Sequence, residues 1–179
     1  MSKLKAEVIK YSKKLNITNL SALRSGNISI RVKEKGIEGF YITPSGRKYS
    51  SLKPQDIVFV SLKGIFDKKK GKPSSEWRFH QDIYVNKKEA KAIVHAHSTC
   101  ATAVSTHQKT IPAFHYMVAV AGGEDIKCSK YATFGTKSLS RNIIKALKNR
   151  SACLIANHGQ VAFGENLKRT FELAQEIEN

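Results

Sequence analysis

The chain has 179 residues, 41% of them apolar and 25% charged, which is sufficient for one globular domain over residues 1–179 with its own core. No apolar run approaches the ~20 residues that a membrane span needs, and the N-terminus lacks the apolar segment of a signal peptide. The three cysteines have no paired spacing, which is typical of reduced thiols. We therefore expect a cytoplasmic protein without a membrane partner.

The formal net charge of +17 would favour a nucleic acid or another polyanion as partner if the basic residues were clustered. The 31 Lys and Arg residues are instead spread along the chain, and the one dense run, residues 68–72, has the composition of a turn. No zinc-finger spacing or RNA-binding aromatic pattern accompanies it. We therefore predict no nucleic-acid partner, and a lysine-rich surface that favours anionic substrates.

The first half of the chain is expected to form one helix and three strands. The i, i+4, i+7 spacing of apolar residues predicts an amphipathic helix over residues 3–15. Alternating apolar residues predict strands over residues 27–32 and 39–43, with a turn at residues 35–36 between them. A third strand is expected over residues 56–61.

The second half is expected to alternate helices and short strands. The predicted helices span residues 76–86 with Ser75 as N-cap, about Thr99 onward, 136–149, and about Asn166 to the end. The predicted strands are short and buried, at residues 92–95, 152–156 and 160–163. Strands early and late with helices between them indicate an α/β or α+β fold, in which helices flank a sheet.

Three histidines are candidate metal ligands. His95 and His97 lie two residues apart at the end of a predicted strand, so their side chains share one face and can converge on one ion. By itself an HxH pair is more often a surface accident. His158 strengthens the metal hypothesis, because it lies in a tight NHG turn directly after an apolar strand. Three imidazoles leave a fourth position free, which is the pattern of a catalytic rather than a structural zinc site.

Glu76 opens a predicted helix directly after two serines. A carboxylate there could simply complement the helix dipole, but the hydroxyls and N–H groups of Ser74 and Ser75 could also bind a phosphate. Further small donors stand in other predicted turns, at Asn27, Ser45 and Gly46. Together with the histidines, these residues indicate a metal site beside an anion site.

Three other residues are further candidates for the site. His80 follows Glu76 by four residues and could share its helix face, but a packed or capping histidine is the favoured interpretation. His107 is expected on the surface. Tyr116 could supply a phenolic proton, although a buried aromatic is the ordinary interpretation.

Eight short motifs, in order along the whole chain, resemble the class II aldolase/adducin family. They are SGNIS (25–29), ITPSG (42–46), PSSEWRFH (73–80), VHAH (94–97), IPAFHYM (111–117), AGG (121–123), YATFGT (131–136) and NHG (157–159). PSSEWRFH together with YATFGT is the most specific combination. Within the family, the motifs look most like those of the members that cleave L-fuculose 1-phosphate.

The resemblance implies an α/β (α+β-like) fold with a central, mainly antiparallel sheet flanked by helices. It also implies a homotetramer with active sites at subunit interfaces and one Zn²⁺ per subunit. The implied reaction is the reversible cleavage of L-fuculose 1-phosphate, or a close ketose 1-phosphate, to dihydroxyacetone phosphate and L-lactaldehyde.

The resemblance also implies roles for individual residues. His95, His97 and His158 match zinc ligands, and Glu76 matches a residue that ligates the empty enzyme's zinc and acts as acid and base with substrate. The residues that match the phosphate site are Asn27, Ser45, Gly46, Ser74 and Ser75. Tyr116 of a neighbouring subunit matches a proton donor to the aldehyde oxygen, and Phe134 matches a pocket wall. The family's aldolases continue beyond the position of Asn179 with a tail whose Tyr closes over the substrate, so the resemblance does not carry aldehyde selectivity over to these residues.

Other functions remain open on the same motifs. The scaffold also serves aldol cleavage of a deoxypentulose phosphate, epimerisation of a pentulose 5-phosphate and dehydration of methylthioribulose 1-phosphate. A non-catalytic interaction module, as in adducin, is the alternative of a different class. It predicts missing metal ligands, whereas all three histidines and Glu76 are present.

Overall fold

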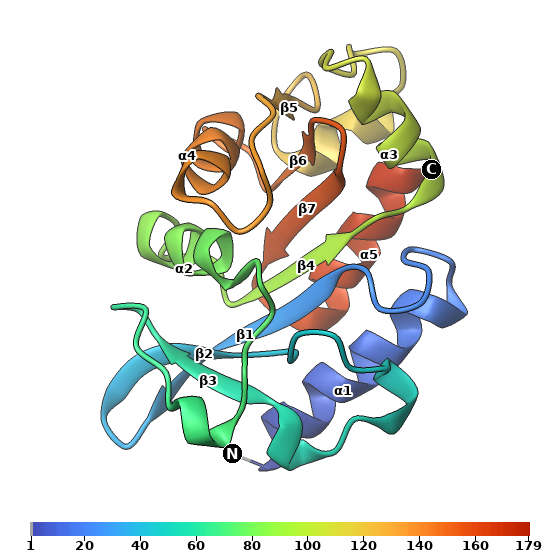
Figure 1. Ribbon diagram of the computed structural model, residues 1–179. Coiled ribbons are helices and arrows are strands. Elements are labelled where there is room, and N and C mark those ends of the chain that lie inside the picture. Colours follow the sequence, from blue (N-terminus) through green and yellow to red (C-terminus); the bar gives the residue numbers. More distant parts are fainter. Residues whose placement is uncertain (1) are drawn as a thin grey trace.

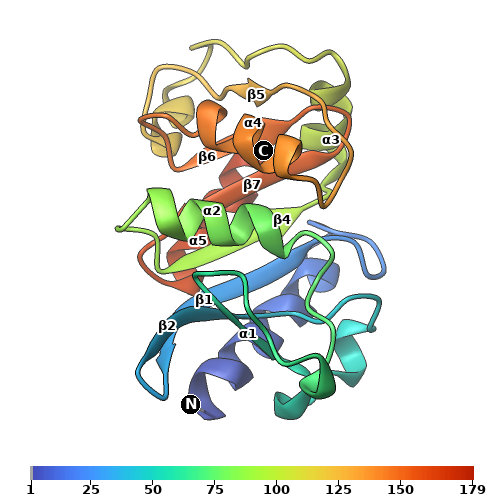
Figure 2. The same cartoon turned by 60° about the vertical axis from the view of Figure 1, so that its left-hand side comes forward.

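A computed structural model describes residues 2–179, in which seven strands form a single sheet with helices on both faces (Figure 1). The strand order is β3-β2-β1-β4-β7-β6-β5. Helices α2 and α4 lie against one face, and α1 and α5 lie against the other, as the rotated view in Figure 2 also shows. The predicted α/β fold is therefore a three-layer arrangement with β1, β4 and β7 at its centre.

The strands are short and mostly antiparallel. Their bounds are β1 Asn27–Glu34, β2 Ile37–Ile42, β3 Val58–Ser61, β4 Ala92–Ala96, β5 Cys128–Ser129, β6 Ala152–Ile155 and β7 Gly159–Gly164. All paired neighbours run antiparallel except β5 and β6, which are parallel. The expected mainly antiparallel sheet is thus confirmed. The sequence did not predict β5, because two residues carry no periodic pattern.

The helices begin and end close to the predicted positions. Their bounds are α1 Ser2–Ile17, α2 Trp77–Asn86, α3 Thr99–Thr106, α4 Lys137–Ala146 and α5 Leu167–Glu178. Thr136 and Asn166 cap α4 and α5, each accepting a bond from the backbone N–H three residues on. The prediction of Ser75 as N-cap of α2 is wrong. Glu76 occupies that position without a capping bond, because its carboxylate is turned toward the histidines instead.

Side chains of alternate strand residues fill two cores, one on each face of the sheet. Ile28 and Val94 pack against α1 and α5, whereas Phe40, Ile93 and Val161 face α2 and α4. Each of these five residues is completely buried, and burial of such a side chain contributes about 1.5–3 kcal/mol. The polar residues of the site lie on the α2 side, at the ends of the same strands.

Strand register and one glycine position the segments that carry the site. The β1–β4 pairing sets Asn27 opposite His95, and the β4–β7 pairing sets Ala96 opposite Gln160. Gly159 begins β7 with φ +155°, and a Cβ there would lie 2.3 Å from the carbonyl oxygen of Ala96. Only glycine permits this close backbone approach. The turn before it is consequently held directly against the end of β4.

The basic run at residues 68–72 is exposed and includes the short 3-10 helix Lys68–Lys70, so the predicted turn is confirmed. Within residues 2–179 we find no helix with the length and apolar character that crossing a membrane would require.

Candidate active site

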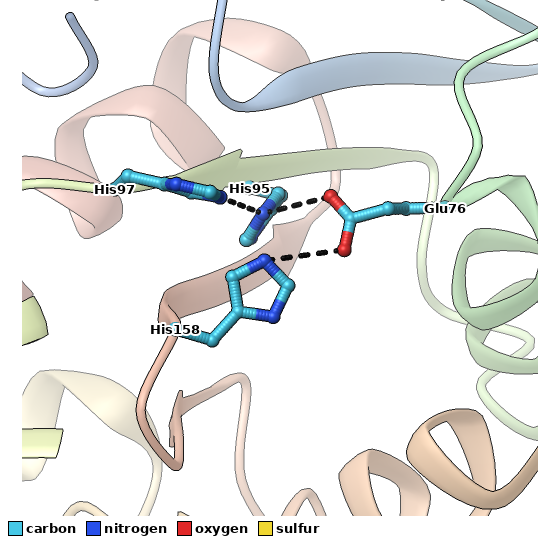
Figure 3. A group of neighbouring side chains, drawn as sticks. All are labelled: Glu76, His95, His97 and His158. Carbon is cyan, nitrogen blue, oxygen red and sulfur yellow. Dashed lines mark hydrogen bonds and ion pairs between the residues drawn. The ribbon is translucent and has the colours of Figure 1, made fainter. Parts of the chain in front are cut away.

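Four side chains from distant segments converge at the end of the central strands (Figure 3). Glu76 stands at the start of α2, and His158 lies in the turn between β6 and β7. His95 belongs to β4, and His97 directly follows the end of that strand. One ligand atom from each of the four lies within 4.8 Å of the others. The structure therefore brings together all four residues that the sequence predicted as metal ligands.

His95 is oriented by the backbone of the neighbouring strand. Its ring is completely buried, and Nδ1 donates to the carbonyl oxygen of Gln160 at 2.7 Å. Because a carbonyl oxygen only accepts, the proton lies on Nδ1, and the lone pair of Nε2 faces the cluster. Nε2 lies 2.9 Å from His97 Nε2 and 3.1 Å from Glu76 Oε2. This is the tautomer and orientation of a metal-ligating histidine.

Glu76 places a buried carboxylate among the imidazoles. Oε2 accepts a bond from Asn27 Nδ2 at 3.0 Å, whereas Oε1, 3.2 Å from His158 Nε2, has no hydrogen-bond partner within residues 2–179. A buried carboxylate oxygen without a donor is satisfied by a cation.

The remaining two histidines are neutral at physiological pH. Burial is the main cause that lowers the pKa of His97 to about 3 and of His158 to about 4, and His95 lowers both further. Neutral imidazoles offer the lone pairs that metal binding needs. Three imidazoles and one carboxylate therefore form a donor set that fits a divalent metal ion.

A pocket of about 380 Å³ opens above the cluster. Glu76, His97 and His158 line this pocket, and His95, completely buried against Glu76 and His97, completes the four-residue cluster that forms its floor. The residues expected to bind phosphate or to form a wall all line it, namely Asn27, Ser45, Gly46, Ser74, Ser75 and Phe134. Their places in one pocket agree with the predicted positions, while the roles stay predictions.

Tyr116 does not line this pocket. It begins the 3-10 helix Tyr116–Ala121 and its side chain is 78% exposed, so the ordinary interpretation as a buried aromatic is wrong. A role for Tyr116 in catalysis would have to be exercised in another copy of the chain.

His80 and His107 lie where the sequence predicted them, the first packed in the interior and the second on the surface. His80 is completely buried and bonds to Asn27 and Ser29, so it is a packed residue rather than a member of the metal cluster. His107 is exposed at the C-terminal end of α3.

Sequence reasoning missed several residues that line the pocket, among them Arg24, Tyr131 and Asn157. Arg24 Nη1 donates to the carbonyl oxygen of Gly46 at 3.1 Å, and within residues 2–179 Arg24 is the single Lys or Arg of the pocket lining. The available signals were weak: Arg24 directly precedes the SGNIS motif, Tyr131 opens YATFGT, and Asn157 opens NHG.

Comparison with known proteins decides the family. Residues 6–179 match the sequence profile of the class II aldolase and adducin N-terminal domain. The chain belongs to the class II aldolase and adducin family. The cluster of Glu76 and three histidines is accordingly the candidate metal site of a family whose aldolases use a divalent ion.

Similar proteins of this family cover almost the whole chain. A 5-methylthioribulose-1-phosphate/5-deoxyribulose-1-phosphate aldolase from Rhodospirillum rubrum is 43% identical over 175 residues, which cover 98% of this chain and 77% of that protein. An L-fuculose phosphate aldolase from Escherichia coli is 42% identical over 177 residues, covering 99% and 80%. The solved structure of an L-fuculose 1-phosphate aldolase matches with a TM-score of 0.93 at 42% identity, covering 99% of this chain and 82% of that one. The predictions of family, fold class and enzyme type are confirmed.

Proposed function

We propose that the chain is a Zn²⁺-dependent aldolase that reversibly cleaves L-fuculose 1-phosphate, or a close ketose 1-phosphate, to dihydroxyacetone phosphate and an aldehyde, L-lactaldehyde for the fuculose substrate. One observation carries the proposal: the Glu76, His95, His97 and His158 cluster forms the floor of a pocket whose rim offers serine hydroxyls and an arginine. A metal site beside an anion site is what cleavage of a phosphorylated ketose needs.

The proposed metal ligands are the three histidines, with Glu76 as a fourth ligand in the substrate-free enzyme. Bound Zn²⁺ supplies Lewis-acid stabilisation of the negative charge that develops on the substrate oxygens. Glu76 Oε1 is the atom that we assign to proton transfer, because Oε2 is already engaged by Asn27. A carboxylate oxygen without a hydrogen-bond partner, on a residue that lines the pocket, suits Glu76 to take and return a proton there.

The phosphate site is proposed on two loops that are tied together. Ser45 N–H donates to the carbonyl oxygen of Lys72 at 3.1 Å, and Ser74 N–H donates to that of Thr43 at 3.0 Å. These bonds occupy two backbone donors, so the proposed phosphate ligands are the serine hydroxyls, the N–H groups of Gly46 and Ser75, and the free donors of Arg24. The guanidinium suits a phosphate because it is charged at every relevant pH.

The aldehyde end of the substrate is assigned to the opposite wall. Phe134 and Tyr131 line it with largely exposed rings, and Tyr116 of a neighbouring subunit is the proposed proton donor to the aldehyde oxygen. That role requires the proposed homotetramer with active sites at subunit interfaces. Cys100, Cys128 and Cys153 form no disulfide in the described part of the chain, which supports the proposed cytoplasmic location.

A second candidate substrate is a 5-deoxyribulose 1-phosphate or its methylthio counterpart. The observation that favours it is the 43% identity to the Rhodospirillum rubrum aldolase, which is one percentage point above the 42% identity to the Escherichia coli L-fuculose phosphate aldolase. Both candidates release dihydroxyacetone phosphate and differ only in the aldehyde, so both use the same metal and phosphate sites.

The test is release of dihydroxyacetone phosphate by the zinc-loaded protein from each of the three ketose 1-phosphates, with His95→Ala beside it. His107→Ala is the matched control, since His107 is exposed and outside the pocket. Turnover lost with chelator and with His95→Ala, but kept with His107→Ala, would support the aldolase, and the preferred ketose would name the aldehyde. Bound zinc without turnover would redirect the search to the other reactions of the scaffold. If the protein bound no zinc and showed no turnover, the catalytic proposal would be refuted.

A further inference from the structure

A row of buried polar side chains leads from the interior of the protein to Glu76. Tyr84 OH lies 2.8 Å from Ser29 Oγ, which lies 2.7 Å from His80 Nδ1. His80 Nε2 lies 2.5 Å from Asn27 Oδ1, and Asn27 Nδ2 lies 3.0 Å from Glu76 Oε2. All five residues are buried, and none of the first three belongs to the metal cluster or lines the pocket.

The chemistry of the groups fixes the direction of two of these hydrogen bonds. The amide nitrogen of Asn27 only donates, so Glu76 Oε2 accepts from it. The amide oxygen of Asn27 only accepts, so His80 must carry a proton on Nε2 and donate it. This orientation of the Asn27 amide therefore requires that His80 carries its proton on Nε2.

The surroundings of His80 fix the other two bonds. Its ring is completely buried between the rings of Phe79 and Phe40, with centroids 4.7 and 6.4 Å away, and no carboxylate bonds to it within residues 2–179. The imidazole is therefore neutral, and burial, the largest cause, lowers its pKa to about 3. With the proton on Nε2, Nδ1 accepts from the hydroxyl of Ser29, and the oxygen of Ser29 in turn accepts from Tyr84 OH.

The far end of the row is anchored to the last turn of α2 and to the loop that follows it. The Arg31 guanidinium lies over the Tyr84 ring, 4.9 Å from its centroid, and donates to the carbonyl oxygens of Tyr84, Lys87 and Ala90. These contacts hold the Tyr84 ring in place, with its hydroxyl at hydrogen-bond distance from Ser29. Every bond in the row then points toward Glu76.

We propose that Tyr84, Ser29 and His80 are positioning residues that lock the Asn27 amide, so that Asn27 always donates to Glu76 Oε2 and proton exchange is confined to Oε1. The catalytic half of this inference rests on the proposed aldolase function, whereas the fixed amide and tautomer do not. Without the row, the amide could rotate and set its oxygen against the carboxylate, which would disturb Glu76 as ligand and as base. The lock also means that Asn27 offers the pocket only an N–H donor, never an acceptor.

Histidine NMR tests the tautomer without any activity measurement. In ¹⁵N-histidine-labelled protein, metal-free and zinc-loaded, His80 is expected to show a protonated Nε2 and an unprotonated Nδ1 at neutral pH. The assignment is made with His80→Gln. A proton on Nδ1 would overturn the proposal, because Asn27 Oδ1 would then have no donor.

Paired substitutions separate positioning from packing. The amide of His80→Gln can still donate to Asn27 and accept from Ser29, whereas His80→Leu can do neither. We expect His80→Leu to lower kcat, and to weaken zinc binding, about 10–100-fold, the usual range for partners that orient a metal ligand. His80→Gln should recover most of that loss, and KM should change little in either variant. Equal losses in both variants would overturn the proposal, since packing alone would then explain them.

Tyr84→Phe provides the mildest test and has a matched control within the chain. Tyr41 is as deeply buried as Tyr84, but its hydroxyl has no hydrogen-bond partner within residues 2–179. Tyr84→Phe should lower kcat by roughly 3–10-fold, below the range for direct partners, while Tyr41→Phe leaves it unchanged. Equal effects of the two would refute the row. If the protein cleaves none of the three ketose phosphates, the aldolase proposal fails, and the NMR tautomer and zinc affinity still decide the positioning role.

Discussion

The floor and the mouth of the pocket differ in how deeply their side chains are buried and in how firmly hydrogen bonds hold them. At the floor, Glu76 and His95 are buried, and each has one atom held by a hydrogen bond while another faces the cluster. At the mouth, Arg24 and Phe134 are exposed, and Arg24 has one recorded bond, to a backbone oxygen. A fixed geometry suits metal binding and proton transfer, whereas exposed groups can adjust to the substrate. We therefore expect changes at the floor to affect kcat and changes at the mouth to affect KM.

The largest expected effect is at the floor. His95→Ala removes a ligand and leaves Glu76 Oε2 without its imidazole neighbour, so we expect zinc to be lost and kcat/KM to fall by roughly 10³-fold or more. Zinc content and steady-state cleavage of a ketose 1-phosphate measure the effect. Retained zinc with a changed KM alone would contradict the proposed division between floor and mouth.

A substitution in the turn that holds His158 should have a nearly as large effect, in this case on the free energy of unfolding. Gly159→Ala would set a Cβ against the Ala96 carbonyl oxygen in a backbone conformation that favours glycine, so we expect a loss of roughly 2–4 kcal/mol. Gly36→Ala is the control. It also has positive φ, but its Cβ would meet nothing within 4 Å, so about 1 kcal/mol is expected. Thermal unfolding of both variants measures the difference, and equal losses would show that the close approach to β4 is unimportant.

A smaller and different effect is expected at the mouth. Arg24→Gln removes the pocket's cation, and we expect KM for a ketose 1-phosphate to rise about 10-fold, the value of an exposed charge-assisted hydrogen bond, with kcat nearly unchanged. Arg47→Gln is the matched control, since Arg47 is exposed and paired with Asp56 at 3.6 Å. A fall in kcat with an unchanged KM would place Arg24 with the floor.

The smallest effect is expected outside both regions. Glu178 on α5 accepts bonds from the backbone N–H groups of Cys100 and Ala101 on α3 at 2.8 and 2.9 Å. Burial opposes ionisation, but these bonds lower the pKa of Glu178 below its ordinary value of 4.5. A lowered pKa stabilises the fold above pH ~4.5, and this contribution is lost as the pH falls through the folded-state pKa.

Glu178→Gln should therefore cost less than about 1 kcal/mol near pH 7, since the residue is only half-buried and solvent screens its interactions. The difference between variant and wild type should shrink as the pH is lowered below 4.5, the ordinary pKa of the group. Urea unfolding at several pH values measures it. If the stability difference between Glu178→Gln and wild type did not change with pH, the ionised carboxylate would not be the form that stabilises the fold.

Local patterns were sufficient to predict most of the fold and the residues of the candidate metal cluster. The alternation of residues 92–95 set His95 on a strand, and its two-residue spacing from His97 set both rings on one face. The NHG turn predicted the place of His158, and its left-handed Asn157 with Gly159 explains why. In each case the pattern and the chemistry lie within a few consecutive residues.

Features set by tertiary contacts could not be predicted in this way. Strand β5 exists because two residues pair with β6, and Ser75 loses the capping position because Glu76 turns toward histidines far away in the sequence. Arg24 enters the pocket through its bond to Gly46, on another loop. The orientation of Asn27 depends on His80, for which the sequence shows only a position four residues after Glu76.

The arrangement of the cluster across the sheet has a thermodynamic consequence. Its proposed ligands come from α2, β4 and the β6–β7 turn, so the unfolded chain offers no preformed site, and a divalent ion held by them would bind the native state alone. Free ion concentration then acts on the folding equilibrium by mass action, adding about 2.7 kcal/mol at 100 times Kd. Calorimetric melting should show Tm rising with the logarithm of free zinc, with a slope that vanishes in His95→Ala. The metal supply of the cell would thereby set how long each chain survives unfolding, as well as how fast it turns over.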